Sequence, residues 1–300
     1  MTDIVITGAT GVIGRRAVRA LRASGHRVSG VTRSARGRAV VESLGASAIE
    51  GDVFDEEALT AAFAGADTVI NLLTHIPRRA AMALPEAWRE NDRLRREASA
   101  VVARAAHAAG AATLVQESIA LLYADGGDAW LDEDSSIDAA GATLTAFSAE
   151  SNAIQLFAGK TVVLRFGMFI GPDSDLAAAS VEAARAGVSP TLGPRDGYQA
   201  TVWLDDAAAA IVAAVGAPAG DYNVADSEPP TRGEMDAALA AAVGRTTLRP
   251  ASEEAPPVLE PLARSQRVSS ARLREATGWA PRVRGGIHGW RLIPQHRKAA

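Results

Sequence analysis

Three glycines near the N-terminus have the spacing of a loop that holds a diphosphate. Gly8, Gly11 and Gly14 follow the β-branched segment Asp3–Thr7 directly. A side chain at Gly8 or Gly11 would hinder the tight turn and the approach of a pyrophosphate, and Gly14 lets the next helix pack on the strand. The helix N-terminus then offers free N–H groups to the phosphates. The order strand, loop, helix predicts a dinucleotide site formed by Gly8, Thr10, Gly11, Val12, Ile13 and Gly14.

A basic residue follows the second predicted strand, at a point where NAD-selective sites usually have an acid. This residue is Arg33, and it comes nineteen positions after Gly14. A guanidinium there can bind the 2′-phosphate of NADP through two hydrogen bonds. Arg33 therefore predicts NADP as the cofactor, although a solvated basic turn would look the same in sequence. Asp52, which Val53 follows, is placed to contact the adenine amine or to act as an ordinary turn residue.

Four side chains that can hold or move a proton follow the fourth and fifth predicted strands. Ser118 is a candidate for positioning a substrate oxygen, or a strand-end hydroxyl that bonds to the backbone. Tyr123 is the preferred proton-transfer residue, or a tyrosine packed under the next loop with its hydroxyl in water. His75 is a candidate general base, or a hydrogen-bonded structural histidine. Glu117 is a further candidate base, or a paired acid at a strand end.

Composition limits the classes of partner. The formal net charge of −4 gives no basic field for nucleic acid, and the absence of cysteine excludes disulfides and thiolate chemistry. No apolar run approaches the roughly 18 residues of a membrane span, so we expect no membrane segment and a cytoplasmic location. One acidic loop is better explained as a solvated loop or substrate lid than as a metal site, and no metal is predicted. Its acids are Asp125, Asp128, Asp132, Glu133 and Asp134.

Short β-branched runs alternate with alanine-rich stretches over the first 170 residues, which is typical of βαβ units on a parallel sheet. The predicted strands are Asp3–Thr7, Arg27–Thr32, Ala46–Glu50, Thr68–Leu73, Thr113–Gln116 and Thr161–Arg165. Helices are expected to begin near Val12, Arg36, Asp55, Pro85 and Ala142. The predicted fold is α/β, a doubly wound parallel Rossmann sheet with a smaller C-terminal substrate domain.

The domain boundary is predicted where the alternation weakens, after Gly171-Pro172. Residues 1–170 would form the NADP-binding Rossmann domain. Most of residues 171–300 would form the C-terminal substrate domain, with about 199–215 returning to the Rossmann sheet.

Taken together, these motifs resemble the extended short-chain dehydrogenase/reductase family, which includes NAD(P)-dependent sugar epimerases and dehydratases. The run Thr7–Gly14 matches the TGxxGxxG fingerprint of that family. Further similar segments are Leu164–Gly167, Trp203–Ala207, Tyr222–Val224 and Thr277–Pro281. The resemblance implies cofactor contacts from Val53, Leu72 and Phe166, beside the glycine loop.

The chain departs from this family at its catalytic pair, a tyrosine followed four residues later by a lysine. The residues four positions after Tyr123, Tyr198 and Tyr222 are Gly127, Val202 and Asp226, so no such pair exists. Aligning the helix through Glu150 puts Ala142 and Ala146 at the two positions. This loss points to an atypical active site.

The resemblance implies an NADP-dependent oxidoreductase, or an epimerase- or dehydratase-like enzyme, acting on a small metabolite. In that reading Ser118 positions the reacting oxygen, and Tyr123 or water passes the proton. Two alternatives stay open: a non-redox acid–base enzyme on the same fold, and a non-catalytic NADP-sensing protein. Relatives often dimerise through two helices, here Pro85–Ala109 and Ala142–Ala158, so a homodimer is expected.

Overall fold

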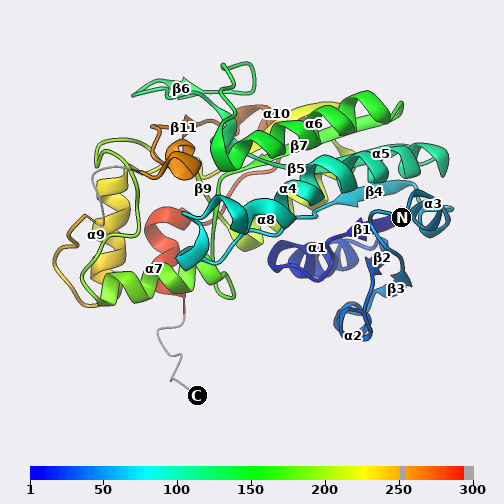
Figure 1. The fold of residues 1–300 in the computed structure, drawn as a ribbon, viewed down its shortest axis with the longest axis horizontal. Coiled ribbons are helices and arrows are strands. Elements are labelled where there is room, and N and C mark those ends of the chain that lie inside the picture. The colour runs from blue at the N-terminus through cyan, green and yellow to red at the C-terminus, as the bar shows by residue number, and fades with distance from the viewer. Residues whose placement is uncertain (251–254, 294–300) are drawn as a thin grey trace.

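A seven-stranded sheet forms the centre of the protein (Figure 1). The computed structural model describes residues 1–250 and 255–293. The strand order is β10-β7-β5-β4-β1-β2-β3, and every neighbouring pair is parallel. The strands are β1 (Asp3–Thr7), β2 (Arg27–Thr32), β3 (Ser47–Glu50), β4 (Thr68–Asn71), β5 (Thr113–Ile119), β7 (Lys160–Phe166) and β10 (Gly220–Val224). The chain is thus a Rossmann-like α/β fold, as the alternating pattern predicts.

Two layers of helices bury the sheet, one against each face. On one face α1 (Val12–Ala23) and α8 (Leu204–Gly216) pack on β-branched residues such as Ile4 and Ile6. On the other face α3 (Glu56–Ala62), α5 (Ser99–Ala108) and α6 (Leu144–Leu156) pack on Val5 and its neighbours. Both faces are covered, which explains why the strands read as nearly continuous apolar runs.

Four helices begin at clear capping residues. Ser34 caps α2 (Ala35–Ser43), and Asp55 caps α3, each accepting a hydrogen bond from a first-turn N–H. Ser174 caps α7 (Asp175–Arg185), and Thr231 forms a capping box with Glu234 at α9 (Arg232–Ala242). These side chains satisfy N–H groups that the helix itself leaves unpaired. The last helices are α10 (Ala271–Thr277) and α11 (Trp290–Leu292).

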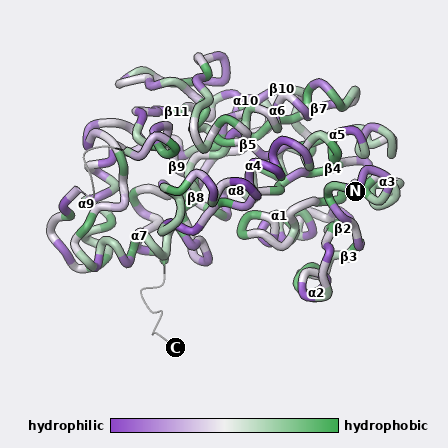
Figure 2. Tube along the Cα trace, in the orientation of Figure 1, coloured by the Kyte–Doolittle hydropathy of each residue, from purple (hydrophilic) through white to green (hydrophobic). Residues whose placement is uncertain are grey.

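The predicted long helix from Pro85 is a sequence of four connected segments. A 3-10 turn, Pro85–Trp88, leads into α4 (Arg89–Arg93), then into a π-helical turn at Leu94–Ala98, and then into α5. Segment α4 is strongly hydrophilic (Figure 2). Among the described residues, no helix is long and apolar enough to span a membrane.

A smaller lobe gathers beside the carboxyl ends of the strands. Strands β8 (Met168–Ile170) and β9 (Thr201–Trp203) pair with each other, and β6 (Trp130–Leu131) pairs with β11 (Arg267–Val268). Helices α7, α9 and α11 pack around Trp290, which is fully buried.

The segment that was expected to return to the main sheet, residues 199–215, forms a strand and a helix that lie in different places. Its helical part, α8, does pack on the Rossmann core, but β9 joins β8 and stays outside the central sheet. The added strand of that sheet is β10, which pairs with β7 and was not predicted. Its residues Gly220–Val224 include Gly and Asp, which weaken the sequence signal for a strand.

Candidate cofactor and substrate site

A cavity of about 460 Å³ opens at the carboxyl ends of β1, β4, β5 and β7. Open α/β sheets bind their ligands at this edge, where the strand order reverses. Many of the predicted cofactor-binding residues line it: Gly8, Thr10, Gly11, Val12, Ile13, Leu72 and Phe166. Residues that are far apart in sequence therefore meet at one site suited to a dinucleotide.

The glycine loop has the tight backbone that the sequence predicts. Gly8 has a φ of 79°, and a Cβ there would lie 2.5 Å from the Leu72 carbonyl oxygen. A Cβ at Gly14 would lie 2.1 Å from the Gly8 oxygen, so Gly14 permits the packing of loop and helix. Gly11 is exposed, and its Cβ would meet only the Gly8 oxygen at 3.3 Å. Gly11 therefore keeps space open in front of the loop.

The N-terminus of α1 faces this space without a capping side chain. Gly11 is its N-cap residue, and no side chain accepts from the first-turn N–H groups. These groups and the positive end of the helix dipole suit a bound diphosphate. The residues present therefore fit a dinucleotide.

Four predicted cofactor residues lie outside the cavity wall: Gly14 within α1, and Arg33, Asp52 and Val53 on loops after β2 and β3. Arg33 is exposed and forms no hydrogen bond or ion pair within the described residues. Asp52 Oδ1 accepts a hydrogen bond from the Phe54 N–H at 3.1 Å, which is a turn contact. This edge corresponds to the adenosine end of a dinucleotide whose phosphates lie on the glycine loop.

Neither Ser118 nor His75 is part of the described cavity wall. Glu117 and Ile119 both line the cavity, and successive side chains of a strand point to opposite faces, so Ser118 points away. The Ser118 hydroxyl is buried without a hydrogen-bond partner among the described residues. His75 is exposed, while its neighbours Thr74 and Ile76 face the cavity. The roles predicted for Ser118 and His75 at a substrate stay predictions.

Tyr123 is fully buried and also lies outside the described cavity wall. Its hydroxyl donates to Asn223 Oδ1 at 2.8 Å and accepts from an Arg165 N–H at 3.2 Å. Burial raises the pKa of Tyr123 to about 12, against the opposing effect of Arg165. The hydroxyl thus ties β10 to the loop after β5 and is a poor proton donor.

We expect Tyr123→Phe to affect stability more than turnover. Removing the hydroxyl leaves the Asn223 carbonyl without its donor, which should cost about 1–3 kcal/mol of unfolding free energy. Turnover should stay within about threefold, because a missing general acid would cost roughly 100-fold. Thermal unfolding and steady-state kinetics check both effects. A hundredfold loss of turnover in a folded variant would indicate that Tyr123 transfers a proton in the reaction.

Apolar residues occupy the cavity wall where the missing tyrosine would stand. Ala142 lies in the 3-10 turn before α6 and lines the cavity, and Ala146 is fully buried one turn later. Ile119, the last residue of β5, faces the same space. Ile119, Ala142 and Ala146 themselves offer no hydroxyl or ammonium group, and the hydroxyl of the neighbouring Thr143 donates to the Ala140 carbonyl at 2.8 Å.

A buried ion pair lines another part of the cavity. Arg95 lies in the π-helical turn, and its Nη2 donates a hydrogen bond to Glu117 Oε1 at 2.8 Å. The two side chains are only 1% and 6% exposed. Burial raises the pKa of Glu117, while Arg95 acts to lower it. The sequence singles out Glu117 but not Arg95, which looks like any other arginine of a polar helix.

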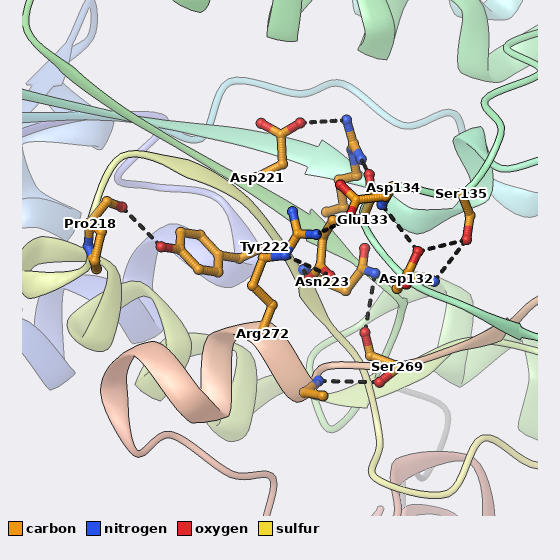
Figure 3. A network of polar contacts seen from close by, with 12 residues as sticks. Asp132, Glu133, Asp134, Ser135, Pro218, Asp221, Tyr222, Asn223, Ser269 and Arg272 are labelled. Atoms are coloured by element: carbon orange, nitrogen blue, oxygen red, sulfur yellow. Dashed lines mark hydrogen bonds and ion pairs between the residues drawn. The ribbon is translucent and has the colours of Figure 1, made fainter.

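The acidic loop is fastened to the C-terminal part of the chain (Figure 3). Glu133 accepts from the Asn223 N–H at 2.7 Å, and Arg272 on α10 pairs with Glu133 at 3.4 Å and Asp134 at 2.6 Å. Asp132 accepts from Ser135 at 2.9 Å. Within the described ranges, no group of three or more His, Cys, Asp or Glu side chains could hold a metal ion. These contacts give the loop a structural role.

Comparisons with known proteins agree with this fold. Residues 4–225 match the model of the NAD dependent epimerase/dehydratase family. A 3-diazoavenalumate denitrifying reductase of a Streptomyces species is 33% identical over 299 residues, covering 93% of this chain and 95% of that protein. An epimerase family protein of Mycobacterium bovis is 28% identical, with 81% and 80% covered.

Solved structures share the fold at lower identity. The human epimerase family protein SDR39U1 with NADPH has a TM-score of 0.80 at 21% identity, with 97% of this chain and 98% of that chain covered. The UDP-glucose 4-epimerase of Thermus thermophilus with NAD has a TM-score of 0.74 at 24% identity, with 96% and 99% covered. This chain belongs to the NAD dependent epimerase/dehydratase family and is an NAD(P)-dependent enzyme of the short-chain dehydrogenase/reductase type.

Proposed function

We propose that this protein is an NADPH-dependent reductase whose substrate needs a hydride but no proton from the enzyme. An arenediazonium ion, a cation that loses N₂ on reduction, is the first candidate. The observation that carries the proposal is the apolar wall formed by Ile119 and Ala142, together with the absence of a Tyr-x-x-x-Lys pair in the sequence. In this proposal Ser118 and Tyr123, which lie outside the described cavity wall, do not replace that pair.

The chemistry of the substrate decides whether such a wall is a disadvantage. Reduction of a carbonyl creates an alkoxide, which requires a proton donor or an oxyanion partner in the transition state. An arenediazonium ion has no such requirement. When bound, NADPH supplies the hydride, whose electron pair forms the new C–H bond. The C–N bond breaks, its electron pair leaves with N₂, and no proton is consumed.

The residues of this chain would then act by positioning. The glycine loop would hold the diphosphate, and Leu72 and Phe166 would contact the cofactor beside it. The apolar wall would exclude water, which protects a reactive cation from hydrolysis. The name of the Streptomyces relative, a denitrifying reductase for a diazo compound, supports this substrate class.

The decisive experiment offers the enzyme two electrophiles of similar shape. Purified protein and NADPH are incubated with 4-methylbenzenediazonium and with 4-methylbenzaldehyde. We expect NADPH oxidation, toluene and N₂ in equal amounts from the diazonium, above the rate without enzyme, and almost no reduction of the aldehyde. Reduction of the aldehyde at a comparable rate would contradict the proposal, as would consumption of the diazonium without NADPH oxidation.

NADP specificity is the second part of the proposal, and it depends on Arg33. We expect NADP(H) to bind more tightly than NAD(H), because the exposed guanidinium has no competing partner among the described residues. Arg33→Asp should remove most of the preference by deleting a charge-assisted contact and repelling the 2′-phosphate. Calorimetric titration with both cofactors measures this, and Arg19→Asp on α1 is a control for charge alone. Equal affinities in the unmutated protein would contradict the assignment.

We also propose a homodimer and, from the sequence, a cytoplasmic location. Leu144, Phe147 and Ile154 on α6 are 47%, 42% and 54% exposed, which is unusual for large apolar side chains on one helix. A partner copy would cover them. Analytical ultracentrifugation should give a dimer, and Phe147→Glu should give a monomer. A monomer for the unmutated protein would contradict this expectation.

A further inference from the structure

The ion pair between Arg95 and Glu117, two residues that line the cavity, is incomplete. Only one hydrogen bond joins the two side chains, from Arg95 Nη2 to Glu117 Oε1. Three atoms of the pair are buried without a partner among the described residues: Arg95 Nε, Arg95 Nη1 and Glu117 Oε2. Buried donors and acceptors that stay unpaired are costly, so such groups in a cavity wall indicate a missing ligand.

The other deeply buried ion pair of the sheet shows the difference. Arg165 donates to both oxygens of Glu150, at 2.9 and 2.8 Å, and its remaining nitrogen donates to the Tyr123 hydroxyl. Every nitrogen of that guanidinium and both oxygens of that carboxylate have partners. The Arg165 pair lies outside the cavity wall, whereas the incomplete pair belongs to it.

The backbone that carries Arg95 supports a role in binding. Arg95 lies in the π-helical turn Leu94–Ala98, between α4 and α5. Such turns widen a helix locally and are frequent at functional sites. Here the turn brings a charged side chain from a hydrophilic helix into a largely apolar cavity, where it meets Glu117 of β5.

The unpaired groups define the hydrogen-bonding character of the ligand. Arg95 offers donors, and Glu117 Oε2 offers an acceptor. A ligand carboxylate would satisfy only Arg95, and it would place a second negative charge beside Glu117. A hydroxyl group both donates and accepts, so it can satisfy both side chains at once.

The other residues of the cavity wall indicate what kind of molecule carries this hydroxyl group. Aromatic and aliphatic side chains line the same cavity as the pair: Trp88, Phe166, Phe169, Met82 and Leu176. Such walls suit a flat apolar ring, which they can contact on both faces.

We propose that Arg95 and Glu117 bind the hydroxyl group of a phenolic substrate. Glu117 Oε2 accepts the phenol O–H, and an Arg95 N–H donates to the phenol oxygen. This inference rests on the proposed function, since it names the class of ring that carries the reducible group. Anchoring the ring at the hydroxyl fixes its orientation toward the cofactor.

The first test compares ligands that differ only in the hydroxyl group. The NADPH-loaded protein is titrated with 4-methylphenol, with its methyl ether 4-methylanisole, and with 4-methylbenzoate. We expect the phenol to bind roughly ten- to a hundredfold more tightly than the ether, as for hydrogen bonds to charged groups. The benzoate should bind more weakly than the phenol. Equal affinities for phenol and ether, tighter binding of the benzoate, or no detectable binding of the phenol would overturn the proposal.

The second test connects the ligand hydroxyl to Glu117. Glu117→Gln keeps an oxygen for the Arg95 hydrogen bond but removes the charge. This variant should bind 4-methylphenol roughly tenfold more weakly and should bind 4-methylanisole with unchanged affinity. Glu150→Gln is the matched control, because it neutralises the other buried glutamate–arginine pair. It should change neither affinity. Thermal unfolding and NADPH affinity verify that both variants are folded and loaded. An equal loss of phenol affinity in both variants, or none in Glu117→Gln, would overturn the assignment.

These binding measurements do not depend on turnover. If the diazonium is not reduced but phenol and ether differ as described, the reductase proposal fails and the binding site stands. If the diazonium is reduced but phenol and ether bind equally, the substrate anchor fails and the reductase proposal stands.

Discussion

Gly11→Val should abolish cofactor binding while leaving the protein folded. The Gly11 Cβ position has only one near neighbour, the Gly8 oxygen at 3.3 Å, so the folded chain can accept a side chain there with a small shift. The added methyl groups would extend into the space in front of the α1 N-terminus, where the pyrophosphate must lie. Calorimetry should therefore show NADPH affinity reduced by roughly 100-fold or more.

A matched substitution separates this effect from general damage. Gly216 at the end of α8 also has open space around its Cβ position, and it lies outside the cavity wall. Gly216→Val should bind NADPH as the unmutated protein does. Both variants should unfold close to the temperature of the unmutated protein. Retained NADPH affinity in Gly11→Val would mean that the loop does not hold the diphosphate.

Arg165→Met should produce the largest loss of stability. The guanidinium is 3% exposed and bonds both oxygens of Glu150, which is itself 2% exposed. Burial alone would lower the pKa of Arg165, but the hydrogen bonds that Arg165 donates to Glu150, together with the charge of that carboxylate, outweigh burial and raise the pKa. Without Arg165, a buried carboxylate has no counter-ion, which typically costs about 3–5 kcal/mol. Urea unfolding measures the difference.

The double variant Arg165→Met/Glu150→Met tests the reason for that loss. If an uncompensated charge causes the damage, removing the second charge should restore much of the stability, because apolar residues of similar volume often replace buried ion pairs without cost. Asp221, which also contacts Arg165, is 29% exposed and keeps access to water. A double variant as unstable as Arg165→Met would indicate that lost packing is the cause.

The sequence by itself determined the central sheet and the cofactor loop. Local patterns carry both: β-branched runs make strands, and the three glycines allow a turn that other residues would block. It also determined that the usual catalytic pair is absent, since a count of lysines and tyrosines requires no structure. Strand β10 escaped prediction because its stability comes from pairing with β7 and not from its own polar residues.

Only the tertiary structure decided which side chains face the cavity. The sequence suggested a fifth strand that ends at Gln116, with Ser118 free beyond it. The strand instead continues to Ile119, and its alternation turns Ser118 away while Glu117 and Ile119 face inward. Because side chains alternate along the strand, the cavity wall receives the Ile119 side chain in place of the Ser118 hydroxyl.

Contacts between distant segments decided the remaining roles. Tyr123 finds its partner Asn223 one hundred residues later in the chain, and this hydrogen bond makes it part of the framework. Arg95 meets Glu117 because a helix packs against a strand end, and no local pattern marks either residue as a partner of the other. Local sequence encodes the backbone conformation, whereas the packing of elements determines which polar groups remain unpaired in the cavity.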